Sequence, residues 1–270
     1  PPDITSLTPD TCCDVDRLDG RAVLVVGASA SGVQLADEIA RTGREVVVAV
    51  GEHVRLPRRY RDRDVFWWLD AAGVLDQTYL EVDDLVRARR LPSPQLVGSP
   101  DGRSVDLAAL AGRGVQLVGR LVAIDDRTFR FSGGLRNVCA LADLKMNRLL
   151  ESLDEWAAAT EFDGPAPERF AATPVPQRPA LEIPIGRIGT VVWATGYHAD
   201  HSWIGLPVLD RRGDVRHDGG VVSDAPGMYL LGAPLLRRRR SSYISGADAD
   251  ARDLAGELHH HLDTHCSHLC

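Results

Sequence analysis

Residues 22–32 read Ala-Val-Leu-Val-Val-Gly-Ala-Ser-Ala-Ser-Gly, an apolar run that ends in a turn bounded by two glycines. The run over 22–26 predicts a buried parallel strand. After the turn, apolar residues recur at helical spacing as far as Gly43, and a second apolar strand is expected over 45–50. A strand, glycine turn, helix and strand in this order hold a dinucleotide pyrophosphate at the helix N-terminus. The stretch therefore predicts an α/β fold with a Rossmann-like, three-layer NAD(P)-binding domain.

The turn departs from the GxGxxG pattern at one position. Gly27 and Gly32 fill the first and third glycine positions, but Ser29 fills the second. Serine hydroxyls at the start of a helix can cap it and can donate to a phosphate. An ordinary βαβ unit with a capped helix and no ligand is the alternative interpretation. The turn residues that the pattern assigns to cofactor binding are Gly27, Ala28, Ser29, Ala30, Ser31 and Gly32.

The composition is that of an ordinary globular protein. Of the 270 residues, 44% are apolar, which suffices for a packed core, and the net charge of −7 argues against nonspecific binding of nucleic acid. No apolar run approaches the roughly 18 residues of a membrane span, and the first residues show no secretory signal. Five cysteines without a CxxC pair indicate reduced thiols and a cytoplasmic location.

The chain divides into five expected parts. They are a polar linker over 1–19, the dinucleotide-binding domain over 20–135, a helix and proline-rich connector over 136–186, a second α/β segment over 187–258, and a His- and Cys-rich tail over 259–270. The strands over 114–124 and 127–131 should form a hairpin. A helix is expected over 137–160, with Leu141, Leu144 and Leu150 on its apolar side.

Three other stretches have less specific patterns. Trp67 and Trp68 lie in an amphipathic stretch and are expected in the core of a helix rather than along a substrate path. The four arginines over 237–240 suit either a solvated face or an anionic ligand. The histidines and cysteines of the tail are too closely spaced for the usual zinc modules, so we expect a disordered terminus and no metal site.

Two later stretches repeat the order of apolar strand and glycine. One reads Thr-Val-Val-Trp-Ala-Thr-Gly-Tyr over 190–197, and the other reads Gly-Met-Tyr-Leu-Leu-Gly over 227–232. Small residues at the carboxyl ends of strands let the backbone approach a ligand closely in an open α/β sheet. The candidate cofactor-binding residues at these strand ends are Ala194, Thr195, Gly196, Tyr197 and Gly232.

With the nucleotide turn, the basic stretch Arg-Leu-Pro-Arg-Arg over 55–59 and the two strand ends, the chain resembles the flavin-containing and Baeyer–Villiger-type monooxygenases. It also resembles their bacterial relatives described as FAD-dependent oxidoreductases. The resemblance implies a middle domain that binds NADPH, inserted into a FAD-binding domain. The segment over 187–258 is then the C-terminal half of a second Rossmann-like domain, which binds FAD, and the resemblance places Ser241 and Ser242 at the flavin.

Members of this family begin with a first GxGxxG that binds the FAD pyrophosphate. Here only the short linker precedes the first strand, so we expect this chain to lack that N-terminal segment. Half a FAD site leaves open strand edges, which invite a missing segment or a partner chain. A small-molecule substrate is expected, but neither nucleic acid nor a membrane.

The loop after the second strand bears on the choice between NAD and NADP. Glu52 can take the ribose 2′-OH of NAD, whereas arginine suits a 2′-phosphate. Relatives that use NADPH carry basic residues in this loop, so the resemblance favours NADP, with NAD possible. In the alternative interpretation the arginines form a solvated surface loop. The basic residues of the loop are Arg55, Arg58, Arg59 and Arg61.

The leading hypothesis is a monooxygenase-like flavoprotein in which NADPH reduces FAD, oxygen accepts the electrons and a small organic molecule is the substrate. The two cofactors carry this chemistry, so no catalytic side chain is assigned. One alternative is a non-catalytic dinucleotide-binding module or subunit that has lost flavin binding. Another is a flavin-linked reductase that passes electrons to a protein or a quinone.

Overall fold

The computed structural model describes residues 4–12, 14–18, 20–97 and 102–266. The chain forms two compact units. The first comprises Pro1–Trp68 and Leu91–Gly196, and the second comprises Leu69–Arg90 and Tyr197–Cys270. The predicted boundaries after residues 135 and 186 do not divide the units, because the long helix, the connector and the strand that follows it all belong to the first.

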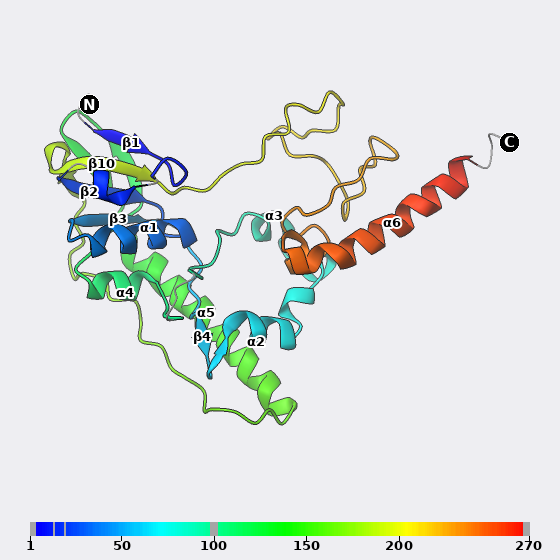
Figure 1. Cartoon of the computed structure of the whole chain (residues 1–270), viewed down its shortest axis with the longest axis horizontal. Helices are drawn as coiled ribbons and strands as arrows, with labels where there is room; N and C mark the ends of the chain where they lie inside the picture. Colours follow the sequence, from blue (N-terminus) through cyan, green and yellow to red (C-terminus); the bar gives the residue numbers. More distant parts are fainter. Residues whose placement is uncertain (1–3, 13, 19, 98–101, 267–270) are drawn as a thin grey trace. The chain divides into compact units, whose positions relative to one another are not determined.

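A parallel five-stranded sheet with the order β1-β10-β2-β3-β6 forms the centre of the first unit (Figure 1). From β2 the chain continues to β3 and β6 on one side, and it later returns to β10 on the other side of β2. The strand order therefore reverses at β2, as it does at the switch point of a Rossmann sheet. The predicted α/β class with a parallel central sheet is confirmed. The strands are β1 (Thr5–Leu7), β2 (Ala22–Val26), β3 (Val46–Val50), β6 (Gln116–Gly119) and β10 (Ile188–Trp193).

Two strands of this sheet come from segments for which the sequence pattern predicts a different place in the fold. β1 lies within the predicted linker over 1–19, and β10 lies within the predicted FAD-type segment over 187–258. β10 is buried from Ile188 to Val192 and pairs in parallel with β1 on one side and β2 on the other. A strand that is apolar throughout suits such a central position. Both assignments are corrected accordingly.

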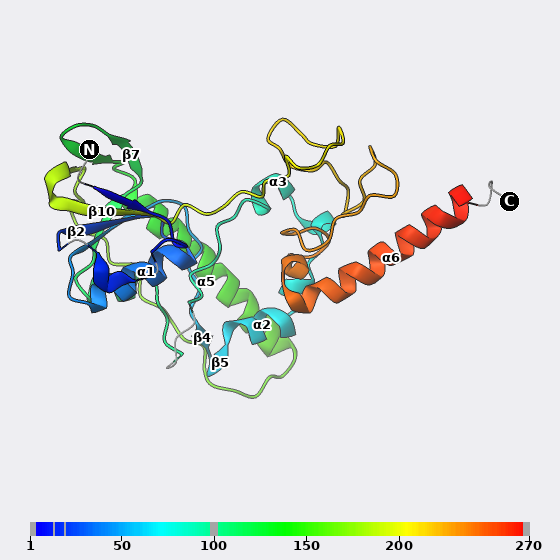
Figure 2. The same ribbon diagram turned by 45° about the horizontal axis from the view of Figure 1, so that its top comes forward.

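The sheet is the middle of three layers. Helices α1 (Ala30–Arg41) and α4 (Leu107–Gly112) cover one face, and a small antiparallel sheet covers the other (Figures 1 and 2). Successive side chains alternate between the faces, so Val25 packs with the helices while Leu24 packs with the small sheet. The strands of the small sheet are β7 (Leu121–Ile124), β8 (Thr128–Phe131) and β9 (Glu182–Pro184). The predicted hairpin is the pair β7–β8.

Helix α5 (Leu135–Ala159) confirms the predicted long helix but buries a different face. Cys139, Met146 and Leu150 are buried, at spacings of seven and four residues that place them on one stripe of the helix. Leu141 and Leu144 are exposed. The prediction that these two leucines face the core is wrong, because they lie off the stripe.

The rest of the first unit is made of short elements. The proline-rich connector is irregular over 161–181, as predicted. A two-residue hairpin turn joins β4 to β5, and α2 begins at the end of β5. The short elements are the 3-10 helices η1 (Val15–Arg17) and η4 (Ile185–Arg187), the strands β4 (Arg59–Tyr60) and β5 (Arg63–Asp64), and helix α2 (Val65–Ala71), which continues into the second unit.

The second unit has a small core around Val208, Val215 and Val222. The strand expected over 227–232 is reduced to an isolated bridge between Val221 and Tyr229, and the described part of this unit holds no extended sheet. The predicted second α/β sheet is therefore not formed by these residues. The helices are η2 (Val74–Asp76), η3 (Tyr79–Glu81), α3 (Leu85–Ala88), η5 (Arg239–Ser242) and α6 (Ile244–Cys266).

Helix α6 corrects the expectation of a disordered tail, because it continues through the histidine-rich stretch as far as Cys266. Cys13, His268 and Cys270 lie outside the described residues. Within the described ranges, no group of three or more His, Cys, Asp or Glu side chains is arranged to hold a metal. None of the helices in the part of the chain that the structure describes combines the length and the apolar character that crossing a bilayer requires.

Candidate functional site

The glycine turn lies at the carboxyl end of β2 and leads into the N-terminus of α1. Gly27 has a φ of +114°, which favours glycine, and its N–H donates to the carbonyl oxygen of Ala49 at 3.0 Å. A Cβ atom on Gly27 would lie 2.2 Å from the carbonyl oxygen of Ala194 at the end of β10. No side chain fits in that space, so β2 and β10 can meet here only through glycine.

Gly32 packs α1 against the same turn. A Cβ atom on Gly32 would lie 2.2 Å from the carbonyl oxygen of Gly27 and 3.5 Å from the Ala194 side chain. Ser29 is the N-cap residue of α1, with φ −82° and ψ −173°, an extended conformation that any residue adopts. Serine can therefore replace the second glycine of the motif. The Ser29 hydroxyl makes no capping hydrogen bond, contrary to the expectation that it caps the helix.

The structure brings together two predicted motifs that are far apart in sequence. The N–H of Ala194 donates to the carbonyl oxygen of Val26 at 2.9 Å, so the end of β10 lies beside the glycine turn. Ala194 is buried, whereas Thr195 and Gly196 are exposed. Ligands in open α/β sheets bind at the carboxyl ends of the strands where the strand order reverses. The turn over 27–32 and the strand end over 194–196 occupy that place.

The loop after β3 keeps three of its charged candidates near the surface. Glu52 is exposed. Arg58 is half-buried and forms an ion pair with Asp64, and Arg59 is exposed and donates to the carbonyl oxygen of Asp62 at 2.7 Å. These three side chains stay candidates for the adenosine end of a dinucleotide.

Arg55 is enclosed instead. Its side chain is 5% exposed, and its guanidinium donates to Asp106 at 2.9 Å, to Asp143 at 2.7 Å and to the carbonyl oxygen of Ala171 at 2.9 Å. Asp143 also accepts from the backbone N–H of Thr173 at 2.9 Å. The expectation that Arg55 holds a 2′-phosphate is wrong, because two carboxylates already occupy a guanidinium that solvent does not reach.

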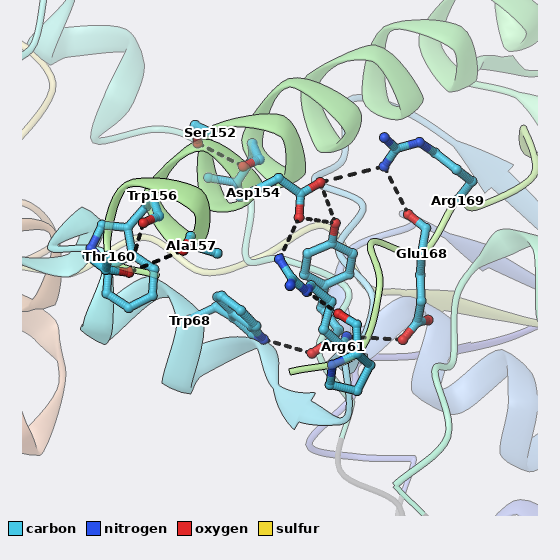
Figure 3. Close-up of polar contacts among 12 residues, drawn as sticks. Arg61, Trp68, Ser152, Asp154, Trp156, Ala157, Thr160, Glu168 and Arg169 are labelled. Carbon is cyan, nitrogen blue, oxygen red and sulfur yellow. Dashed lines mark hydrogen bonds and ion pairs between the residues drawn. The ribbon is translucent and has the colours of Figure 1, made fainter. Parts of the chain in front are cut away.

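Figure 3 shows the contacts that hold Arg61, the last of the four candidate arginines of this loop. Arg61 and Asp62 form the turn between β4 and β5 with φ values of 45° and 60°, which side chains rarely adopt. The Arg61 N–H donates to Glu168 at 3.0 Å, and its guanidinium lies 3.2 Å from Asp154 and 5.3 Å from the ring centre of Trp68. Arg61 is thus an anchor of the hairpin, not a solvated cation.

The tryptophans of α2 pack in an aromatic cluster, as the sequence predicts. Trp68 is fully buried, and its Nε1–H donates to the carbonyl oxygen of Tyr60 at 2.7 Å. Its ring meets those of Trp67, Trp156 and Phe162 edge to face, with centroids 5.0–6.1 Å apart. The cluster fixes the base of the hairpin that carries Arg58 and Arg59.

His53 is a buried residue of the same loop that no sequence motif identifies. It is 2% exposed, and its Nδ1 lies 3.0 Å from the carbonyl oxygen of Gly51. Its Nε2 is buried and has no hydrogen-bond partner among the described residues. Burial lowers the pKa of His53 below its usual value, although the Gly51 carbonyl and Asp143 act in the opposite direction.

His53 should make stability depend on pH. The unfolded chain binds a proton at this histidine near pH 6.5, whereas the folded chain resists protonation until a lower pH. The stabilisation that neutral His53 provides is therefore fully present above the pKa of the unfolded state. It is lost as the pH falls toward the lower pKa of the folded state. Between about pH 7.5 and about pH 5.5 we expect the free energy of unfolding to fall less for His53→Gln than for the wild type, as urea unfolding at both pH values would measure. Equal losses would contradict this role of His53.

The candidates of the second unit are engaged within that unit. Ser241 is buried, and its hydroxyl accepts the backbone N–H groups of Arg237 at 3.0 Å and Arg238 at 2.8 Å. Ser242 and Tyr197 are exposed. Gly232 is exposed with a φ of +81°, and an added Cβ would meet nothing within 4 Å. The positive φ therefore favours a glycine at position 232, and no described atom of the chain approaches it closely enough to exclude a side chain.

The four arginines over 237–240 are neither a solvated face nor free cations. Each contacts an acceptor of the second unit, and the acceptors come from both of its segments. The contacts are Arg237 to Gly219 at 2.9 Å, Arg238 to Asp250 at 2.7 Å, Arg239 to Gln77 at 2.5 Å and Arg240 to Asp76 at 2.9 Å. The run therefore joins 69–90 to 197–266.

The chain has sequence relatives among bacterial oxidoreductases, although no family model matches it. An uncharacterized oxidoreductase named CzcO-like from Geobacillus kaustophilus is 29% identical over 247 residues, which are 91% of this chain and 54% of that protein. The uncharacterized oxidoreductase CzcO of Bacillus subtilis is 22% identical over 269 residues, which are 95% of this chain and 61% of that protein. The chain thus spans about half the length of the curated relatives it matches.

Among solved structures, a mutant of the flavin monooxygenase from Stenotrophomonas maltophilia aligns with a TM-score of 0.53 at 15% identity. The alignment covers 95% of this chain and 55% of that one, and at this identity it concerns the fold alone. A shared fold and distant oxidoreductase relatives agree with the motifs at Gly27–Gly32 and Ala194–Tyr197. The comparisons thus show a fold shared with a flavin monooxygenase and distant sequence relatives among bacterial oxidoreductases.

Proposed function

We propose that this chain serves in a flavin-dependent oxidoreductase of monooxygenase type, in which NADPH supplies the electrons and oxygen accepts them. The observation that carries the proposal is the contact between the glycine turn and the end of β10. A Cβ atom on Gly27 would lie 2.2 Å from the Ala194 oxygen. Such close packing where the strand order reverses leaves the N-terminus of α1 facing the place where a dinucleotide pyrophosphate binds in related folds.

The residues of the first unit fit a nicotinamide dinucleotide. The first backbone N–H groups of α1, from Ser29 onward, have no partner within the helix and can donate to phosphate oxygens. Thr195 and Gly196 are exposed at the neighbouring strand end. When bound, the nicotinamide supplies hydride chemistry, and the protein groups bind and orient it.

The second unit supports FAD less directly. The Ser241 hydroxyl and the arginines over 237–240 are occupied by partners in their own unit, so these residues by themselves define no FAD site. Flavin dependence is supported instead by the oxidoreductase names of the CzcO proteins and by the monooxygenase that shares the fold. A small organic substrate and a cytoplasmic location complete the proposal.

The test is the visible absorption spectrum of the purified chain, with and without added FAD. A flavin band that stays with the protein through gel filtration, and that NADPH bleaches without oxygen, would support the proposal. A matched Gly27→Asp chain should keep the band but lose the bleaching. A protein with neither flavin nor NADPH binding would overturn the proposal.

The alternative function is that of a nicotinamide-dinucleotide-binding module without flavin. The observation that favours it is the engagement of Ser241 and the neighbouring arginines inside the second unit. A colourless protein that still binds NADPH would select this alternative, unless addition of a separate FAD-binding chain restores the band.

The basic hairpin predicts cofactor preference. Replacing Arg58 and Arg59 together by alanine should weaken NADPH binding about tenfold and leave NADH binding nearly unchanged, because only NADPH carries a 2′-phosphate for the guanidinium groups. Fluorescence titration with each nucleotide gives the two affinities. Replacing Arg87, an exposed arginine of α3, provides the control. An equal effect on both nucleotides would remove the argument for a 2′-phosphate site.

A further inference from the structure

Gln95 contacts the glycine turn from a distant part of the sequence. Its side chain is 1% exposed, and its Nε2 donates to the carbonyl oxygen of Ala28 at 2.6 Å. Its backbone N–H donates to the carbonyl oxygen of Val54 at 2.9 Å, next to an isolated parallel bridge between Val54 and Pro94. One residue thus ties the turn over 27–32 to the loop that follows β3.

The hydrogen bond to Ala28 fixes the orientation of a peptide group. A trans peptide is planar, so the Ala28 carbonyl and the Ser29 N–H point in opposite directions, and the structure contains no cis peptide bond among its described residues. Because the buried Gln95 amide holds the Ala28 oxygen, the Ser29 N–H points away from Gln95. Ser29 is the N-cap of α1, and its N–H lies at the end of the helix that attracts anions.

The other end of the Gln95 amide shows that stability alone does not account for this residue. Its Oε1 is buried and has no hydrogen-bond partner in the described ranges, which is unfavourable in a folded protein. Turning the amide over would set Oε1 against the Ala28 oxygen, so the observed orientation is the better one. An apolar side chain of the same length would avoid the unpaired acceptor, and it would lose the donor to Ala28.

We propose that Gln95 is a positioning residue for a dinucleotide pyrophosphate, acting through the peptide between Ala28 and Ser29. The inference rests on the dinucleotide site proposed above and deepens it. The second glycine of the motif is replaced here by Ser29, whose extended conformation does not by itself fix where its N–H points. Gln95 supplies that constraint from outside the turn.

The experiment compares the wild-type chain with Gln95→Met, which keeps the length of the side chain and removes the donor. Each protein is titrated with NADPH and with adenosine 2′-monophosphate, which has no pyrophosphate. We expect the affinity for NADPH to fall about tenfold and that for the monophosphate to change less than about twofold, since one oriented donor to an anion is lost. Gln34→Met, an exposed glutamine on α1, is the matched control and should bind both ligands as the wild type does.

A second variant, Gln95→Glu, replaces the donor by a carboxylate that repels the Ala28 oxygen, and it should lose at least as much NADPH affinity near neutral pH. Thermal unfolding of all variants identifies a general loss of structure, which would weaken both ligands alike. Unchanged NADPH binding in both Gln95 variants, or equal losses for the two ligands, would overturn the positioning role and leave the dinucleotide site intact. A wild type that does not bind NADPH would instead refute the site itself.

Discussion

Chains that carry Gly27→Asp are expected to show no measurable NADPH binding. The Cβ atom of the aspartate would lie 2.2 Å from the Ala194 carbonyl oxygen, so β10 and the turn must separate. The φ of +114° adds roughly 1–2 kcal/mol of backbone strain for any residue with a side chain. The added carboxylate also places a negative charge where the pyrophosphate is proposed to bind. Fluorescence titration with NADPH measures the loss.

A Gly27→Ala chain separates the steric part of this effect from the charge. It should lose roughly 3 kcal/mol of unfolding free energy in urea, because the oxygen it meets belongs to the backbone and cannot turn aside. Gly112→Ala is the matched control, since an added Cβ there meets nothing within 4 Å and the residue lies in α4. If Gly27→Asp bound NADPH as tightly as the wild type, the dinucleotide site would lie elsewhere.

The second large effect is a loss of unfolding free energy on substitution of Arg55. Replacing it by methionine leaves Asp106 and Asp143 buried without the cation that both contact. Removal of one side of a buried ion network costs roughly 3–5 kcal/mol, because the remaining charges are left without compensation. Asp106 is also the N-cap of α4, and Asp143 also holds the connector at Thr173, so the loss should extend to both segments. Urea unfolding measures it.

The control for Arg55 is an ion pair with both partners at the surface. Arg187 and Glu45 are exposed by 39% and 52%, and Arg187→Met should cost at most about 1 kcal/mol. Similar losses in the two variants would mean that burial does not set the strength of the Arg55 network. Retention of NADPH affinity in Arg55→Met chains that remain folded would agree with the exclusion of Arg55 from the ribose end of the site.

The sequence was sufficient for the local features of the site. The strand over 22–26, the glycine turn and the helix after it follow from apolar runs and from residues with special backbone freedom, and these signals are local. The close contact between Gly27 and the Ala194 carbonyl oxygen explains why the turn needs a glycine at this position.

The sequence does not predict which strands pair when they are far apart in the chain. Nor does it predict which polar side chains are buried by residues from distant segments. The turn signals around residue 188 do not say which strands β10 will join, and a three-residue strand such as β1 has no pattern of its own. Arg55 looked like its basic neighbours, although its apolar flanks Val54 and Leu56 hinted at burial. Gln95 had no sequence signal, because its role depends on the backbone of Ala28.

The position of β10 also has a consequence for how the first unit folds. Thr5–Leu7 and Ala22–Val26 never pair with each other, because Ile188–Trp193 lies between them. A chain that leaves the ribosome has already released β2, β3 and β6 when β10 is made, and until then β1 has no partner and β2 presents a bare edge. Contacts of such large sequence separation slow folding. The nascent first unit therefore exposes these unpaired strand edges to chaperones and to misassociation until β10 is synthesised and completes the sheet.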